Sequence, residues 1–300
     1  MSKLLILAVL LISVLTVKAS SGKEFLIQEE VSKNVEITLS KSEDIEKLEY
    51  YLKSISEKDN WLEKEKESFI AKNRKVIETS LENGKKYIPL IISILIKHNL
   101  PTELVFIPAI ESHYINGVKS PKGAAGIWQL MPQTARAFGL VVNRYVDERL
   151  DPIKSTQAAA KYLKHLYGIF GDWKLVLASY NAGHGKVITK VSYHGNSFSD
   201  IRRYLPKQTQ NYLVKFLAFA EEGKRIINKN GLTKEADIEV VQVSGNYDLK
   251  TIAKLAYIPE QRLKELNKHF VRGVIPDDGK IYNLYVPAGY GKLVKVVLDS

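Results

Sequence analysis

Between residues 40 and 225 the sequence shows almost no alternation of apolar and polar residues, and apolar residues instead recur every three or four positions. This spacing is typical of amphipathic helices. Capping signals stand where helices should begin: Ser40 and Glu43 have the spacing of a capping box, and Asp151-Pro152 reads as an N-cap followed by proline at the first helical position. The sequence therefore predicts a mainly α domain over residues 40–223.

The last part of the chain follows a different pattern. Residues 224–237 are polar, contain Asn230-Gly231 and predict a linker. After this linker the sequence predicts strand, helix, helix and strand in turn, over the segments Ile238–Val243, Asp248–Ala256, Glu260–Asn267 and Tyr282–Val286. We therefore expect a small α+β domain of βααβ order over residues 238–300.

The N-terminus has the pattern of an export signal. Lys3 precedes an apolar run from Leu4 to Val17, and Ala19 is a small residue at a plausible cleavage point. The run is shorter than the roughly 20 residues that a spanning helix needs. We expect a signal peptide over residues 1–19, then a linker or extended arm over 20–39, and a periplasmic or cell-envelope location. An uncleaved leader that associates with the membrane is the alternative.

The chain has no cysteine and a formal net charge of +11. The absence of cysteine excludes disulfides, cysteine nucleophiles and cysteine-ligated metals, so an exported chain of this kind must hold its core together by burial alone. A basic exported protein suits a polyanionic partner, of which peptidoglycan is one. Nucleic acid is not expected, since no basic run is interleaved with aromatic residues and no known reader motif is present.

No metal or cofactor is expected. The histidines show no ligand-like pairing, and the sequence has no phosphate-binding glycine loop. The histidine positions are His98, His113, His165, His184, His194 and His269.

The most informative stretch runs from Pro108 to Leu140. Glu111 ends an apolar run, LVFIPAIE, so we expect its carboxyl group at the edge of hydrophobic packing, where desolvation raises the pKa as a general acid requires. Ser112 follows directly, and its hydroxyl could contact the carboxyl group or a sugar. The loop Gly123–Gly126 allows backbone to approach a ligand closely. Taken alone, each of these features is more often a solvated charge or a simple turn.

Together these features resemble the family-1 lytic transglycosylases, which have a lysozyme-like fold. The resemblance covers roughly residues 85–222. Its motifs are Glu111-Ser112, the run Gly123–Thr134 (GAAGIWQLMPQT) and Ser179–Gly183 (SYNAG). The closing helix, with Pro206, Thr209 and Tyr212, fits the branch of membrane-bound lytic murein transglycosylase D.

The resemblance implies that Glu111 is the catalytic residue and that the substrate groove is formed by Ser112, Gly126, Gln129, Met131, Tyr180 and Asn181. It further implies peptidoglycan glycan strands as the substrate. Glu111 would protonate the glycosidic oxygen between N-acetylmuramic acid and N-acetylglucosamine. It would then accept the proton of the muramyl 6-hydroxyl, giving a 1,6-anhydromuramyl end without water.

Two other functions stay open at this point. One is a muramidase that cleaves the same bond with water, and the other is a cell-wall-binding protein without catalytic activity. A muramidase usually needs a second carboxylate. The nearby candidates Asp147, Glu148 and Asp151 lie in RYVDERLDP, where helix capping and salt bridges account for them.

The C-terminal unit resembles the LysM modules that bind glycans containing N-acetylglucosamine. The matching residues are Asp248-Leu249, Thr251–Ala253, Leu263, Leu266-Asn267 and Leu284–Pro287. It departs from that pattern at its opening, where Val243–Tyr247 replaces the usual glycine-aspartate-threonine turn.

Overall fold

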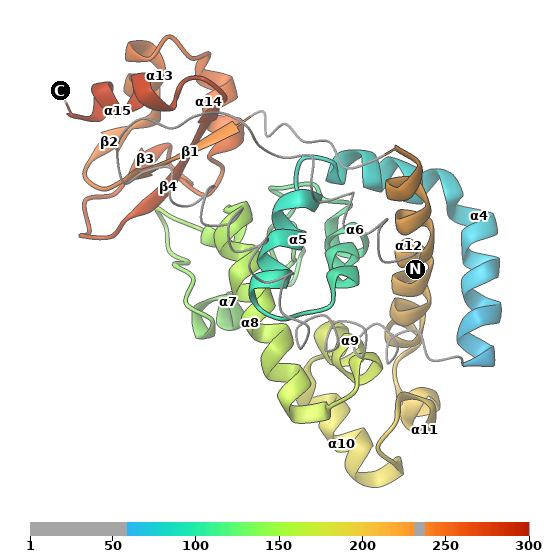
Figure 1. Cartoon of the computed structure of the whole chain (residues 1–300). Coiled ribbons are helices and arrows are strands. Elements are labelled where there is room, and N and C mark those ends of the chain that lie inside the picture. Colours follow the sequence, from blue (N-terminus) through green and yellow to red (C-terminus); the bar gives the residue numbers. More distant parts are fainter. Residues whose placement is uncertain (1–58, 231–237, 300) are drawn as a thin grey trace.

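The computed structural model describes residues 59–230 and 238–299. The predicted signal peptide, the arm over residues 20–39 and the start of the predicted α domain lie outside these residues. Figure 1 shows a larger helical unit and a smaller unit that contains the strands. The predicted fold class, mainly α followed by a small α+β unit, is confirmed.

The helical unit combines three long helices, α4, α8 and α12, with shorter ones between them. Asp172 caps one of them by accepting a hydrogen bond from the Leu175 N–H, and Pro89 stands in the first turn of another, as the sequence indicates. The elements are α4 (Asn60–Gly84), α5 (Ile88–Lys97), η1 (Thr102–Phe106), α6 (Ile107–Ser112), α7 (Pro132–Ala137), η2 (Glu148–Leu150), α8 (Pro152–Phe170), α9 (Trp173–Ala182), α10 (His184–His194), α11 (Phe198–Ile201), η3 (Arg202–Tyr204) and α12 (Lys207–Asn230).

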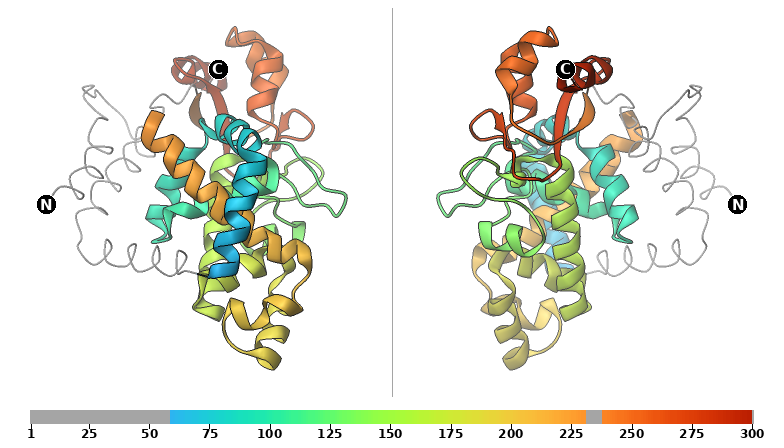
Figure 2. Two further views of the ribbon diagram at one scale, coloured as in Figure 1. Left: turned by 90° about the vertical axis from the view of Figure 1, so that its right-hand side faces the viewer. Right: turned by 90° about the vertical axis from the view of Figure 1, so that its left-hand side faces the viewer.

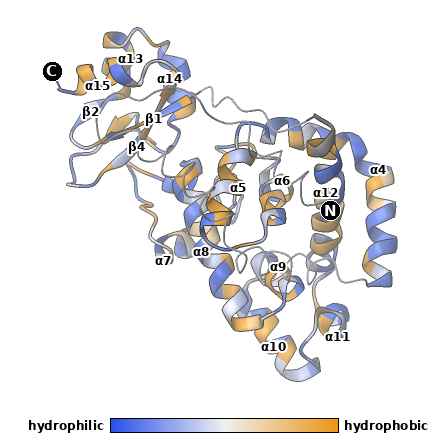
Figure 3. Cartoon of the chain, in the orientation of Figure 1, coloured by the Kyte–Doolittle hydropathy of each residue, from blue (hydrophilic) through white to orange (hydrophobic). Residues whose placement is uncertain are grey.

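Helix α5, whose residues are almost all apolar, as Figure 3 shows, contributes to the core of this unit. Ile91 and Leu95 on α5 are fully buried, together with Trp128 and Trp173. The long helices α4 and α12 lie side by side in Figures 1 and 2 and cover one face of the unit. Hydrophobic burial therefore accounts for the stability of a domain without disulfides.

Helix α12 is longer than predicted. It continues to Asn230, so residues 224–230, predicted as linker, are helical. The extension is anchored: Lys224 pairs with the buried Glu103, the Arg225 Nε donates to Glu222 at 2.7 Å, and Gly223 packs tightly on the Phe106 ring. Most residues of this extension are polar, so the sequence did not indicate that they continue the helix. The rest of the predicted linker lies outside the described residues.

The small unit contains the predicted βααβ elements and some shorter ones. Strand β1 pairs antiparallel with β4, from Ile238 opposite Pro287 to Val243 opposite Tyr282. A second, two-residue pairing joins β2 to β3, and a last helix follows β4; neither is evident from the sequence. The elements are β1 (Ile238–Val243), β2 (Tyr247–Asp248), α13 (Leu249–Leu255), α14 (Glu260–Leu266), β3 (Val274–Ile275), β4 (Tyr282–Pro287) and α15 (Gly291–Asp299).

None of the helices in residues 59–230 and 238–299 has the length and apolar character required to cross a lipid bilayer.

Candidate active site

Glu111 lies in the last turn of the short helix α6. Pro108 stands in the first turn of this helix, and the chain leaves it through two successive residues in the left-handed conformation, His113 at φ 51° and Tyr114 at φ 55°. Non-glycine residues rarely adopt this conformation, so packing must hold it. The buried Tyr114 hydroxyl donates to the Val105 carbonyl at 2.7 Å, which ties the turn back to the core. This tight turn at the end of α6 fixes the position of the Glu111 backbone.

Glu111 is partly buried as a residue. Desolvation raises its pKa from 4.5 to about 7, against smaller lowering effects from the Tyr212 hydroxyl and the Lys215 ammonium group. The prediction that its surroundings favour the protonated form therefore has a physical basis. At neutral pH a substantial fraction of Glu111 carries the proton that a general acid must donate.

Two tyrosines border this carboxyl group. The Tyr180 hydroxyl donates its proton to the Trp128 carbonyl at 2.7 Å, so it can act toward Glu111 only as an acceptor or through its position. The Tyr212 hydroxyl interacts with Glu111, although it has no hydrogen bond of standard geometry to any described residue. Glu111 in turn raises the pKa of both phenols, whose burial is the larger cause.

A cleft of about 370 Å³ opens beside this group. Four predicted site residues line it: Gln129, Met131, Tyr180 and Asn181. Glu111 is not among the lining residues, and Tyr180 connects the two, because it lines the cleft and also interacts electrostatically with Glu111. The other lining residues are Lys122, Leu130, Thr134, Tyr162, Ala182, Gly183, Lys186, Pro206, Gln208 and Thr209.

Fewer donors and acceptors are available to a ligand in the cleft than the residue types suggest. The Gln129 amide nitrogen donates to the Val118 and Gly126 carbonyls, at 3.1 and 2.8 Å, which leaves its oxygen as the group for a ligand. The Asn181 oxygen accepts from the Thr209 hydroxyl at 3.0 Å, which leaves its nitrogen. One acceptor and one donor thus remain on the two amides.

The structure gives Ser112 a different role from the predicted substrate contact. Its side chain is buried, and its hydroxyl lies 2.8 Å from the Ile127 carbonyl and 3.2 Å from the Pro108 carbonyl. The hydroxyl's single proton is therefore used within the protein, and Ser112 joins α6 to the loop after it. Its position beside Glu111 in the sequence does not reveal that the two side chains leave the helix in different directions.

Gly126 also differs from its predicted role, because it lies in the interior and does not line the cleft. Its φ is +79°, and a Cβ added there would stand 1.9 Å from the Arg149 carbonyl oxygen. The close approach that its glycine permits is thus to the protein's own backbone rather than to a ligand.

The three acidic residues of the RYVDERLDP segment have structural partners, as expected. Asp147 forms a bidentate pair with Arg149, at 2.8 and 2.9 Å. Glu148 accepts from Lys154 at 2.5 Å, and Asp151 caps α8. Among the described residues, none of these three shifts the pKa of Glu111, and Lys215 is the one charged group that does.

Sequence reasoning did not select Lys122, Lys186, Thr209 or Tyr162 as site residues. The lysines are two among many in a basic chain, and nothing in the sequence distinguishes them. Thr209 and Tyr162 come from helices far from the Glu111 motif in the sequence. Only the packing of α8 and α12 around α9 brings them to the cleft.

Comparison with known proteins agrees with this geometry. Residues 91–201 match the transglycosylase SLT domain, and residues 237–300 match the LysM-like domain of lytic transglycosylase MltD. The membrane-bound lytic murein transglycosylase D of Escherichia coli (strain K12) is 32% identical over 212 residues. This chain is its homologue. The match covers 68% of the chain and 47% of that relative, so the chain spans about half the length of the curated relative it matches.

More distant similarities concern the SLT domain. This chain is 33% identical over 120 residues to the soluble lytic murein transglycosylase of Escherichia coli (strain K12), and the match covers 36% of this chain and 18% of that protein. Among solved structures, the 70 kDa soluble lytic transglycosylase of Escherichia coli has 23% sequence identity and a TM-score of 0.41, covering 67% of the chain and 34% of that structure.

Proposed function

We propose that this chain is a peptidoglycan lytic transglycosylase in which Glu111 is the sole general acid and then the base. The observation that carries the proposal is the Glu111 carboxyl group, whose pKa burial raises to about 7 beside a cleft of polar and aromatic residues. The names of the homologues, lytic murein transglycosylases, support the same reaction and substrate.

In the proposed reaction the Glu111 proton moves to the glycosidic oxygen between N-acetylmuramic acid and N-acetylglucosamine, and the bond to the muramyl anomeric carbon breaks. The 6-hydroxyl of the same muramyl residue forms the new bond to that carbon and gives its proton to the Glu111 carboxylate. Glu111 ends in its initial state, and no water is consumed. An internal hydroxyl competes well with water because its effective concentration is high.

The structural contacts of the acidic residues in the RYVDERLDP segment support this route over hydrolysis. Hydrolytic glycosidases pair two carboxyl groups about 5–10 Å apart. In the part of the chain that the structure describes, Lys215 is the one charged group that shifts the Glu111 pKa, and Asp147, Glu148 and Asp151 are held in pairs and caps.

The cleft also suits the polyanionic substrate. Lys122 and Lys186 line it, and none of its lining residues in the described part of the chain is a carboxylate, which would favour glycans whose lactyl-peptide stems carry carboxylates. Peptidoglycan lies in the cell envelope, so the proposal also assigns the chain to that location.

The test is the mass of the products that the purified protein releases from sacculi. Glu111→Gln should abolish release, while Glu82→Gln, the same change at an exposed surface pair, should leave it intact. Muropeptides one water lighter than hydrolysed ones support the transglycosylase, whereas hydrated ends would identify a muramidase. Intact sacculi with tightly bound wild-type protein would identify a wall-binding protein.

A further inference from the structure

The C-terminal unit shares its hydrophobic core with the helical unit. Val146, from the segment before η2, is fully buried in the cluster formed by the C-terminal residues, and Val141 packs against the same cluster. The backbone joins there too: Val146 and Phe270 form an antiparallel bridge, and the Asp147 N–H donates to the His269 carbonyl at 2.8 Å. Residues 141–147 therefore fold as part of both units.

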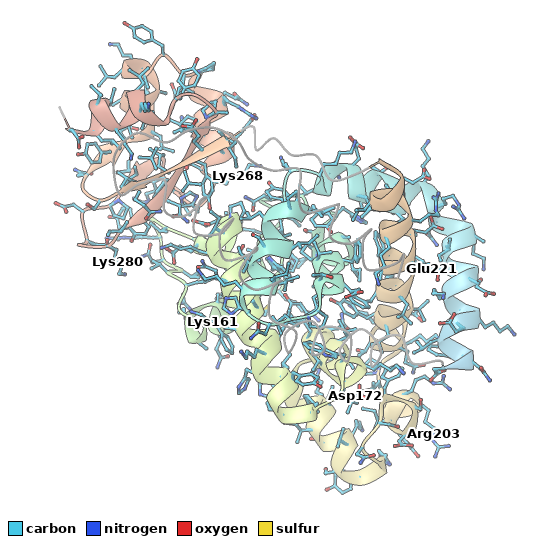
Figure 4. The ribbon with its side chains drawn as sticks, viewed as in Figure 1. Lys161, Asp172, Arg203, Glu221, Lys268 and Lys280 are labelled. Carbon is cyan, nitrogen blue, oxygen red and sulfur yellow. The ribbon has the colours of Figure 1, made fainter. Side chains whose placement is uncertain are left out.

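A buried polar contact lies beside this shared core. The Tyr285 hydroxyl donates to one oxygen of Asp151 at 2.5 Å, and the Asn283 amide donates to the other at 2.9 Å. All three side chains are buried. Asp151 also caps α8, so strand β4 supplies two of the hydrogen bonds that stabilise the carboxylate at the start of that helix. Figure 4 labels Lys268, which adds a contact from this unit to the Asn116 carbonyl at 3.0 Å.

The turn that contains Asp147, Arg149 and Asp151 also contacts the loop over residues 123–130, which leads to the cleft. Arg149, buried and paired with Asp147, donates to the Gly123 carbonyl at 2.5 Å and the Leu130 carbonyl at 3.0 Å. The Arg149 carbonyl packs on Gly126. Two guanidinium bonds and one tight backbone contact thus fix both ends of the loop over residues 123–130.

This loop carries groups that the site needs. Gln129 and Met131 line the cleft at its end, and the Trp128 carbonyl accepts the Tyr180 hydroxyl. Strand β4 therefore contacts Asp151, and Arg149, two residues earlier in the same turn, contacts the loop that forms the cleft wall.

We propose that the C-terminal LysM-like unit acts as a brace for the substrate loop, with Tyr285 and Asn283 as positioning residues that act through Asp151. The proposal rests on the proposed function for its kinetic part only. Tyr285 is 1% exposed, so it cannot touch a glycan, and any effect of its hydroxyl on the cleft must pass through the protein.

The experiment compares Tyr285→Phe with Tyr282→Phe in the full chain. Tyr282 is a buried tyrosine of the same strand, but its hydroxyl bonds to Asp278 inside its own unit. Amide hydrogen exchange over residues 123–131 should quicken about tenfold in Tyr285→Phe and stay unchanged in Tyr282→Phe, because only the first removes a bond to Asp151. Asn283→Ala, which removes the other bond, should act in the same direction.

Kinetics on soluble, uncrosslinked glycan strands provide the second measurement. A displaced loop should raise KM about fivefold to tenfold at nearly unchanged kcat, whereas a partly unfolded sample would lower kcat alone. The proposal that the C-terminal unit braces the loop would be overturned if amide hydrogen exchange over residues 123–131 were unchanged in both Tyr285→Phe and Asn283→Ala. It would also be overturned if these variants were active with an unchanged KM. If the wild type releases no product, the proposed function fails, and the exchange measurement still decides the brace.

Discussion

Replacing Glu111 with glutamine should stabilise the protein at alkaline pH. The folded state raises the pKa of this carboxyl group from 4.5 to about 7. Between these values the folded chain keeps a proton that the unfolded chain has lost, so the free energy of unfolding falls as pH rises through this window. At about 1.4 kcal/mol for each pH unit, the cost of ionising Glu111 in place is about 3 kcal/mol above pH 7. Glutamine has no such cost.

Urea unfolding of both proteins from pH 4 to pH 9 measures this effect. The difference in unfolding free energy should be constant below about pH 4.5, grow in favour of the glutamine variant as pH rises, and level off above about pH 7. The rate of glycan cleavage by the wild type should fall through the same upper limit, since the acid must hold its proton. A stability difference that does not change with pH would refute the argument, because the carboxyl group would then ionise as it does in the unfolded chain.

Further substitutions test the site and the loop beside it. Gly126→Ala should destabilise the fold by about 3 kcal/mol or more in denaturant unfolding, since the new Cβ would overlap the Arg149 carbonyl. Gly123→Ala is the control, because Gly123 has a similar φ but open space around it, and this change should cost only about 1–2 kcal/mol. Equal losses of stability in the two variants would contradict the close approach of Arg149 to Gly126. Asn181→Asp keeps the oxygen that accepts from Thr209 but loses the free amide donor, so KM for glycan strands should rise about tenfold. An unchanged KM would show that Asn181 does not bind substrate. Tyr180→Phe should lower the unfolding free energy by about 1–2 kcal/mol, because the Trp128 carbonyl loses its donor, and a melting temperature equal to wild type would count against that bond.

Local patterns allowed much of the fold to be predicted. The apolar residues of α5 and the caps at Asp151 and Asp172 indicate helices that the structure confirms. These features depend on neighbours in the chain, as helices do. The pairing of β2 with β3 involves two residues on each side and leaves no periodic signal, and the extension of α12 depends on partners in η1.

The sequence selected four residues that line the cleft, Gln129, Met131, Tyr180 and Asn181, but did not indicate the contacts of the others. A motif selects Glu111, Ser112 and Gly126 as site residues. It cannot indicate that the Ser112 hydroxyl is used by the Ile127 carbonyl, or that Gly126 accommodates Arg149. Such roles depend on contacts across the fold, which one sequence does not contain. The roles of Gln129, Met131, Tyr180 and Asn181 in substrate binding stay predictions.

The core shared between the two units limits how the chain can be divided. Cutting after α12 would uncover Val146 and leave the Asp151 carboxylate without Tyr285 and Asn283. The helical unit produced alone would carry an exposed apolar patch and would lose two hydrogen bonds to Asp151, and a grafted C-terminal unit would lack part of its interior. The two units should therefore be more stable when they are expressed and engineered together.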